Sequence, residues 1–186
     1  MSPNTPVETA LSATNLFTGR DVAAILRESG WPYAEQDMGA DAPLQAWLTR
    51  AADLLGPHAA DRAALAELLG LIFRYDALAL LQNATHQAVL AREGAREVIR
   101  ELANRILDGG DVNSDRFKEI IDGMKAALPY RGRSLFFPIR LALAGRIGEG
   151  ELDRVILLLD SAASLGFAVP VKGTRQRILE FCAAFD

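Results

Sequence analysis

Apolar residues recur at intervals of three and four along most of this 186-residue chain, and this periodicity constrains the fold more than any other feature. It is clearest in the segment 94–108, where one helical face carries Ala95, Val98, Ile99, Leu102, Ala103 and Ile106. No run of alternating polar and apolar residues is long enough to indicate a β-strand. The sequence therefore predicts an all-α protein, a multi-helix bundle joined by short turns.

Start and stop signals give approximate bounds for these helices. Asp41 is expected to cap a helix that Gly56 and Pro57 stop, and Asn113 or Ser114 to cap one that ends before Pro129. Ser134 is expected to cap the next helix. With their caps, the expected helices cover about 21–29, 41–55, 61–73, 77–93, 94–108, 113–128, 136–144, 150–160 and 174–185.

The same signals predict how the chain is organised. Residues 1–16 mix Pro, Ser, Thr and Asn without periodicity, so they are expected to form a flexible tail. Residues 17–93 are expected to form an N-terminal helical subdomain and residues 94–186 a C-terminal one. Trp31 and Tyr33 lie in the loop before the second helix, where we expect them to pin the loop to the core.

Cysteine content and hydropathy indicate the setting of the protein. Cys182 is the single cysteine, which rules out an internal disulfide and a cysteine-based zinc site. The first residues do not resemble a secretory leader, and no apolar run approaches the ~18 residues of a membrane span. A cytoplasmic protein without membrane partners is therefore expected.

The sequence contains no complete motif for catalysis or metal binding. Asp111, Asn113, Asp115 and Asp122 imitate the oxygen ligands of a calcium loop, but Arg116 stands where the sharp turn needs Gly. No histidine has zinc-ligand spacing, no Gly-rich phosphate loop is present, and no nucleophile is paired with a base. The sequence therefore predicts a protein that is not an enzyme and holds no cofactor or metal.

Charge divides the chain into two unlike parts. Residues 1–128 hold 18 acidic and 12 basic residues, a net charge of −6, whereas residues 129–186 hold 6 acidic and 8 basic residues, a net charge of +2. The stretch 161–178 contains no acidic residue. Because salt screens charge over about 8 Å, such a local patch attracts phosphates even on an acidic protein.

The clustered cations of the second part are candidates for RNA contact. Tyr130 or Phe167 beside them is a candidate for stacking on an unpaired base. Arg140 lies in an apolar helix, where a structural role is favoured, through helix C-terminal carbonyls or a buried carboxylate. The predicted RNA-binding residues are Tyr130, Arg131, Arg133, Arg146, Lys172, Arg175 and Arg177.

The segment around these cations resembles a known family. The run Arg131-Gly-Arg133 leads through Leu135-Phe-Phe-Pro-Ile-Arg140 to Gly145, and an acid-led helix follows at 150–156. This order is similar to the anticodon-binding C-terminal region of class I glutamyl-tRNA synthetases, with two helices at 98–107 and 117–128 before it. From 44 to 90 the likeness is one of helical pattern only.

The resemblance implies a helical anticodon-binding fold in which Pro138, Arg140 and Gly145 are structural. Ala144 departs from the family, which usually has Thr before this Gly, and the segment 160–170 is longer than the usual turn. The synthetase signatures His-x-Gly-His and Lys-x-Ser-Lys are absent, so aminoacylation by this chain alone is not expected.

Two functions remain open on the sequence. The first is a stand-alone relative that binds tRNA or a tRNA-like RNA without catalysis, with a possible protein partner in the translation machinery. The second is a protein-interaction or scaffold module that kept the helical fold and lost RNA binding, which the net charge of −4 favours.

Overall fold

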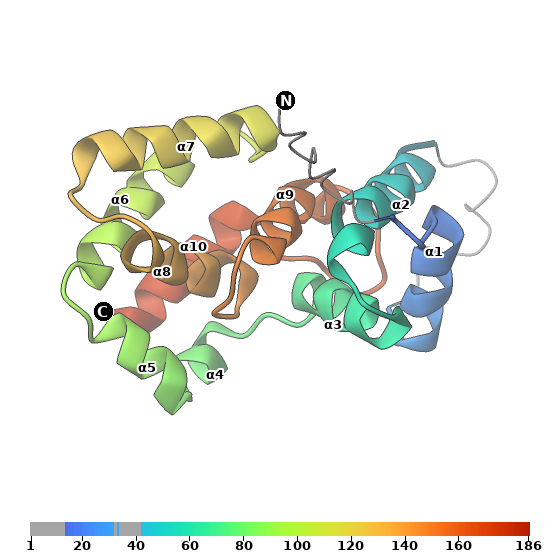
Figure 1. The fold of residues 1–186 in the computed structure, drawn as a ribbon, viewed down its shortest axis with the longest axis horizontal. Coiled ribbons are helices and arrows are strands. Elements are labelled where there is room, and N and C mark those ends of the chain that lie inside the picture. The colour runs from blue at the N-terminus through green and yellow to red at the C-terminus, as the bar shows by residue number, and fades with distance from the viewer. Residues whose placement is uncertain (1–13, 32, 34–41) are drawn as a thin grey trace, which may run out of the picture.

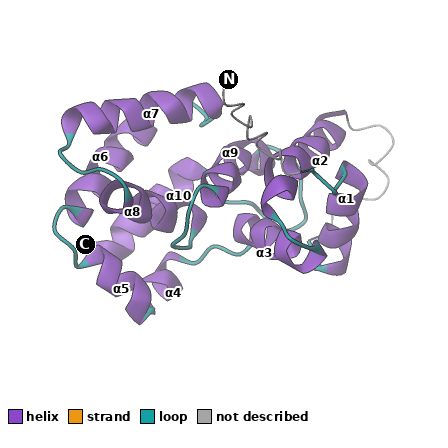
Figure 2. Cartoon of the chain, viewed as in Figure 1, coloured by secondary structure: helices purple, strands orange, loops and turns teal. Residues whose placement is uncertain are grey.

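The computed structural model describes residues 14–31, 33 and 42–186, and within these ranges it contains helices and no strand (Figure 2). This confirms the predicted all-α class. Residues 1–13 of the expected tail and the predicted cap Asp41 lie outside the described residues. The helices, shown in Figure 1, are α1 Gly19–Glu28, α2 Ala42–Leu55, the 3-10 helix η2 Gly56–His58, α3 Arg62–Phe73, α4 Ala77–Gln82, α5 Ala84–Leu90, α6 Ala95–Leu107, α7 Ser114–Ala127, α8 Arg133–Ala144, α9 Glu151–Ala163 and α10 Thr174–Phe185.

Side-chain caps decide where several helices begin. The Asn113 side chain accepts a hydrogen bond from the Arg116 amide at 2.9 Å, so Asn113, the first of the two predicted candidates, caps α7. The prediction for α8 was wrong by two to three residues, because α8 begins at Arg133 and Ser134 lies inside its first turn. Gly132 precedes it with φ +56°, a backbone conformation that glycine adopts without a steric cost.

The segment 77–93, predicted as one helix, forms two short helices. Asn83 is extended (φ −76°, ψ 123°), and its side chain accepts hydrogen bonds from the amides of Thr85 and His86 at 2.9 and 3.3 Å. Asn competes with a helix by bonding to nearby backbone groups, so it ends α4 and caps α5.

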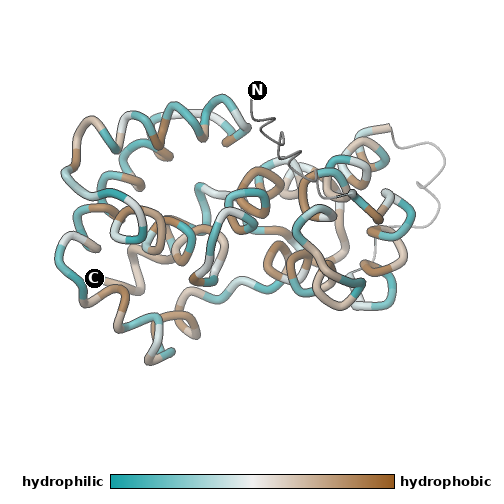
Figure 3. The backbone as a smooth tube through the Cα atoms, in the orientation of Figure 1, coloured by the Kyte–Doolittle hydropathy of each residue, from teal (hydrophilic) through white to brown (hydrophobic). Residues whose placement is uncertain are grey.

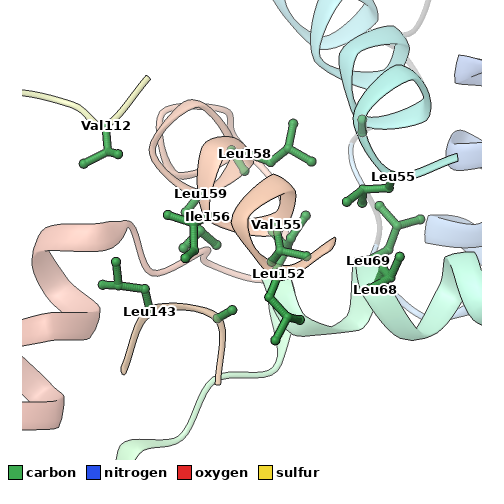
Figure 4. Close-up of a cluster of buried hydrophobic side chains, with 14 of the residues drawn as sticks. Leu55, Leu68, Leu69, Val112, Leu143, Leu152, Val155, Ile156, Leu158 and Leu159 are labelled. Atoms are coloured by element: carbon green, nitrogen blue, oxygen red, sulfur yellow. The ribbon is translucent and has the colours of Figure 1, made fainter. Parts of the chain in front are cut away.

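Helix α9 lies at the centre of the molecule, between α1–α3 and the group of α4–α8 and α10 (Figure 1). It packs on α2, α3 and α8, and Leu152, Val155 and Ile156 are fully buried. Figure 4 shows these side chains in a cluster of buried apolar residues that also includes Leu55 and Leu69. Burial of such a side chain contributes about 1.5–3 kcal/mol. One continuous core therefore joins helices from both predicted subdomains, and the division at residue 93 stays a prediction.

Hydropathy along the backbone follows this packing (Figure 3). Brown, apolar positions recur along the helices that surround α9, and the polar positions between them give each of these helices two unlike faces. In α6 the buried residues are Ala95, Val98, Ile99, Leu102 and Ile106, as the stripe predicted.

An aromatic cluster holds the N-terminal helices against the loop between α9 and α10. The Phe167 ring lies 5.3 Å from Trp47 and 5.1 Å from Phe73, with both pairs edge to face. Trp31 stacks on Phe73 at 5.0 Å, and Tyr33 meets Phe167 edge to face. Trp31 and Tyr33 are both buried, which confirms their predicted core role. The suggestion that Phe167 stacks on a base was wrong, because that ring is 8 % exposed.

Asp160 near the end of α9 ties three chain segments together. Its carboxylate accepts hydrogen bonds from the Val112 amide at 2.7 Å and from the Thr174 amide and hydroxyl at 2.6 and 2.8 Å. Hydrogen bonds to a charged group contribute about 1.5–3 kcal/mol each. Asp160 therefore fixes the start of α10 and the loop before α7 relative to α9.

We predict that Asp160→Ala lowers the free energy of unfolding by about 3 kcal/mol, because it leaves two partly buried amides and a hydroxyl without their acceptor. Urea denaturation followed by circular dichroism measures the change. Asp108→Ala is the matched control, since Asp108 is exposed and its side chain has no hydrogen bond among the described residues; it should change stability by about 0.5 kcal/mol or less. Equal losses for both variants would contradict this role of Asp160.

Candidate nucleic-acid interface

Arg140 clamps α8 to α9. Its side chain is 8 % exposed and donates two hydrogen bonds to the Asp153 carboxylate, from Nε at 2.8 Å and Nη2 at 2.9 Å. A third bond, from Nη1, reaches the Gly148 carbonyl at 2.9 Å. The guanidinium also lies 4.8 Å from the ring centre of Phe136. This geometry corresponds to the carboxylate partner that the sequence suggested, and it leaves Arg140 little surface for a ligand.

Pro138 and Gly145 shape the same helix. Pro138 is buried inside α8, and Gly145 ends the helix with φ +78°. The Gly145 amide donates to the carbonyls of Arg140 and Leu141 at 3.2 and 3.1 Å, which closes the last turn. Both residues therefore occupy structural positions on α8.

Arg133 is a largely exposed cation at the start of α8. Its side chain is 72 % exposed, and its partner Glu149, 64 % exposed, lies 3.5 Å away. The same Glu149 carboxylate lies 3.7 Å from Arg140. Exposed pairs of this kind contribute about 0–1 kcal/mol, so Arg133 is readily available to an anion. Arg146 is 40 % exposed and 3.9 Å from Glu151.

Arg131 and Tyr130 have structural contacts of their own. The Arg131 guanidinium donates to the carbonyls of Lys125, Leu128 and Tyr130 at 2.6–2.7 Å, so it caps the C-terminal end of α7. The Tyr130 ring lies so close to Gly94 that a Cβ atom there would clash with it. Partial burial, and then the neighbouring Glu97 and Glu93, raise the pKa of the Tyr130 phenol. Its surroundings are therefore acidic.

The second predicted cluster, 172–177, separates into unlike parts. Lys172 pairs with Glu180 at 2.7 Å, and Arg175 is exposed but donates to the Leu107 carbonyl at the end of α6 at 3.0 Å. Arg177 is 0 % exposed, so its assignment to an RNA-binding surface was wrong. The structure thus does not bring the predicted cations together on one surface.

Arg177 satisfies carbonyls at the ends of two helices. It donates to Leu71 and Ile72 of α3 at 3.0 and 2.6 Å, to Leu143 of α8 at 2.8 Å and to Lys172 at 2.8 Å. The last four carbonyls of a helix have no intrahelical partner and carry partial negative charge. A guanidinium with five donors is therefore well matched to this position.

Tyr75 completes this junction. Its ring centre lies 4.5 Å from the Arg177 guanidinium, and its hydroxyl donates to the Ala142 carbonyl of α8 at 2.6 Å. Burial raises the pKa of the Tyr75 phenol, and burial lowers the pKa of Arg177 to about 10. Both groups therefore keep their protons at neutral pH. The burial of Arg177 could have been predicted from the sequence, because helical spacing places Arg177 on the same face of α10 as the apolar Ile178 and Phe181.

A groove between α7 and α9 contains cations that the sequence predictions missed. It encloses about 510 Å³, and its lining includes Lys118 and Lys125 of α7 and Arg154 of α9. We call it the α7–α9 groove. The spacing of its α7 residues, at 114, 117, 118, 121, 122 and 125, is a signal in the sequence, since it marks a single helical face.

Across the described residues, no three His, Cys, Asp or Glu side chains are grouped so as to hold a metal ion. None of the helices in these ranges has the length and apolarity that crossing a bilayer requires.

The architecture places the chain among all-α helical-bundle domains. Its sequence matches the family described as the anticodon binding domain over residues 23–165, from α1 to the end of α9. This chain therefore belongs to the anticodon-binding domain family, as the resemblance of its sequence indicated.

Curated relatives are glutamate–tRNA ligases. The enzyme of Bacillus licheniformis is 29 % identical over 115 residues, which are 62 % of this chain and 23 % of that protein. Glutamate–tRNA ligase 2 of Syntrophus aciditrophicus is 26 % identical over 113 residues, 61 % of this chain and 23 % of that protein. The Bacillus subtilis glutamate–tRNA ligase is 27 % identical over 121 residues, which are 65 % of this chain and 24 % of that protein. The matched part is thus about a quarter of each relative. No solved structure matches significantly.

We predict that Arg177→Met lowers the free energy of unfolding by about 3 kcal/mol or more, because four carbonyls lose their donor inside the protein. Arg175→Met, two residues away, should cost about 1 kcal/mol at most, since it removes one bond at the surface. Chemical denaturation of both variants measures the difference. A similar small loss in both would show that the buried guanidinium contributes little.

Proposed function

We propose that this chain binds tRNA or a tRNA-like RNA and performs no chemistry on it. Family membership over residues 23–165 is the observation that carries the proposal. The relatives are glutamate–tRNA ligases, and the matched part is about a quarter of their length. A family described as a binding domain supports recognition rather than catalysis. A cytoplasmic location is part of this proposal, because tRNA is used in the cytoplasm.

The charge distribution is compatible with this function. Arg131 and Arg133 lie in and beside the Gly132 turn at the start of α8, and both are exposed. Arginine presents a planar fork of donors that matches a phosphate, and nearby charge outweighs the net charge of −4 at physiological salt. We therefore propose that Arg133 and Arg146 contact the RNA backbone, and that Arg131 adds positive charge beside them while its guanidinium caps α7.

A scaffold that binds protein instead is the second candidate. The observation in its favour is that Lys172, Arg175 and Arg177 are engaged in internal contacts, which reduces the cationic surface available to RNA. Affinity purification with and without ribonuclease separates the two functions. Partners that survive the nuclease support the scaffold, and co-purified tRNA supports RNA binding.

We predict that the protein binds unfractionated tRNA at low salt and that Arg133→Glu weakens binding about tenfold, with a smaller dependence of affinity on salt. Arg20→Glu is the matched control, because Arg20 is exposed on α1 at the opposite end of the molecule (Figure 1). Fluorescence anisotropy over a salt series measures both effects. Absence of binding at low salt would refute the proposed function.

A further inference from the structure

Helices α6 and α10 pack side by side at the end of the molecule opposite α1 and α2 (Figure 1). Two hollows, of about 490 and 90 Å³, lie along the outer side of this contact. Arg96 of α6 and Phe185 of α10 line both hollows, so the hollows are neighbours on one surface. We call this surface the α6–α10 seam, with the arginines Arg92, Arg96 and Arg100 on one side and the α10 residues Leu179, Cys182 and Phe185 on the other.

The arginine side of the seam is open to solvent. Arg96 and Arg100 lie one turn apart on α6 and line the smaller hollow, and Arg92 lines the larger one. All three are exposed, and neither Arg92 nor Arg100 forms an ion pair with a residue that the structure describes. Arg96 lies 3.7 Å from Asp186, but the two side chains are 61 % and 79 % exposed. A pair of this kind contributes little, so all three guanidinium groups are available to an anion.

The acidic residues of α6 lie mainly along another side of the helix. Glu97 and Glu101 each follow one of the arginines, and one residue along a helix turns the side chain by about 100°. Glu101 is paired with Arg105 at 2.7 Å, and Glu97, at the edge of the larger hollow, lies beside Tyr130. The seam therefore has an excess of positive charge on a chain whose net charge is −4.

The α10 side of the seam is apolar. Leu179 is 49 % exposed, which is unusual for a large apolar residue of this protein. Cys182 and Phe185 follow it at intervals of three residues and are half-buried, so the row runs obliquely from solvent toward α6. The half-buried Leu81 and Ala184 extend this surface into the larger hollow. An apolar strip bordered by charged residues is typical of an interaction site.

The chemistry of this strip suits protein side chains better than nucleic acid bases. The Arg96 guanidinium lies 4.3 Å from the ring centre of Phe185 and so covers a face of the aromatic ring. Leu179, Leu81 and Ala184 are aliphatic, and base stacking requires an open aromatic face. Between Arg96 and Asn104 the seam is about 12 Å long, at 1.5 Å per residue of α6, which is about two turns of a partner helix.

We propose that the α6–α10 seam docks an acidic amphipathic helix of a partner protein. The apolar stripe of that helix packs on the α10 side of the seam, and carboxylates on one flank bind the arginines Arg92, Arg96 and Arg100. Arginine binds a carboxylate through two parallel hydrogen bonds, which fixes the orientation of the docked helix. Two turns bury a small area, so the contact belongs to the weak, transient class. The inference goes beyond the proposed function, because it requires no RNA.

The first test is a charge exchange with a defined probe. The probe is a fluorescein-labelled peptide of about 15 residues, with Leu at every third and fourth position, Glu along one flank and Ala elsewhere. It should bind with a Kd of about 100 μM or tighter at low salt, by fluorescence anisotropy. Arg96→Glu combined with Arg100→Glu should weaken this binding at least tenfold. The same variant should bind a peptide with Lys in place of Glu at least tenfold more tightly than the wild type does.

A matched control carries the same change of net charge at the other end of the molecule. Arg20→Glu combined with Arg62→Glu alters two exposed residues of α1 and α3 and should change the affinity for either peptide less than threefold. Circular dichroism of each variant verifies that it is folded. A scrambled peptide of the same composition, in which the leucines surround the helix, should bind at least tenfold more weakly than the probe.

The second test concerns the apolar strip. Leu179→Ser should weaken binding of the acidic peptide about tenfold, because the docked helix loses an apolar partner. Leu78→Ser is the matched control, since Leu78 is 65 % exposed on α4 and lines neither hollow, and it should leave the affinity unchanged. Amide chemical shifts recorded during titration of the wild type should change chiefly in α6 and α10.

Four results would overturn the inference. The first is that the acidic peptide does not bind, or binds no better than its scrambled form. The second is that the charge-reversed variant binds both peptides as the wild type does. The third is a wild-type dimer that this variant dissociates, which would make the seam a contact between two copies. The fourth is a loss of tRNA affinity in this variant with peptide binding unchanged, which would assign the arginines to RNA. Failure of the peptide to bind leaves the proposed function intact, since that is tested separately with tRNA and Arg133→Glu.

Discussion

The guanidinium of Arg177 is the interaction on which the arrangement of the helices depends. Three of its four carbonyl acceptors belong to the ends of α3 and α8, whose backbone groups would otherwise be buried without donors. The Tyr75 ring lies beside this guanidinium, and its hydroxyl donates to the Ala142 carbonyl of α8. Because α3 belongs to the N-terminal helices and α8 and α10 to the other group, one buried charge joins the two sides of α9. Two helix C-termini supply a negative field, and the nearby carboxylates of Asp160 and Glu180 add to it.

The cations of this chain therefore serve two distinct purposes. Arg131, Arg175 and Arg177 bond to carbonyls at helix ends, and Arg140 holds a carboxylate between α8 and α9. The cations that remain available to a ligand are spread over the start of α8, the α7–α9 groove and the α6–α10 seam. Counting basic residues along the sequence gives two clusters, 131–146 and 172–177, whereas the folded molecule divides the same charges between internal capping and exposed surface.

Periodicity predicted more of the fold than of the site. The apolar stripe of α6 follows a 3.6-residue repeat, and packing on α8 and α10 preserved it. The break at Asn83 escaped prediction because it depends on one side chain that bonds to the local backbone. The start of α8 escaped because it depends on the positive φ of Gly132, and neither feature changes the apolar pattern. Arg175 and Arg177 show why the site was harder to predict from the sequence than the fold. Two residues along a helix rotate a side chain by about 200°, so neighbours in a charge cluster face solvent and core.

The attachment of α7 has a consequence for how the molecule moves. Helix α7 buries only Ile120, Ile121 and Met124, whereas α8 buries eight of its residues, so α7 is held by less apolar area for its length. Local opening costs least where few apolar contacts are broken. Backbone amides of α7 should therefore exchange with solvent deuterium before those of α8 and α9. Helix α7, one wall of the α7–α9 groove, is thus more easily displaced than α9, the other wall. The width of the groove should therefore fluctuate in the folded protein.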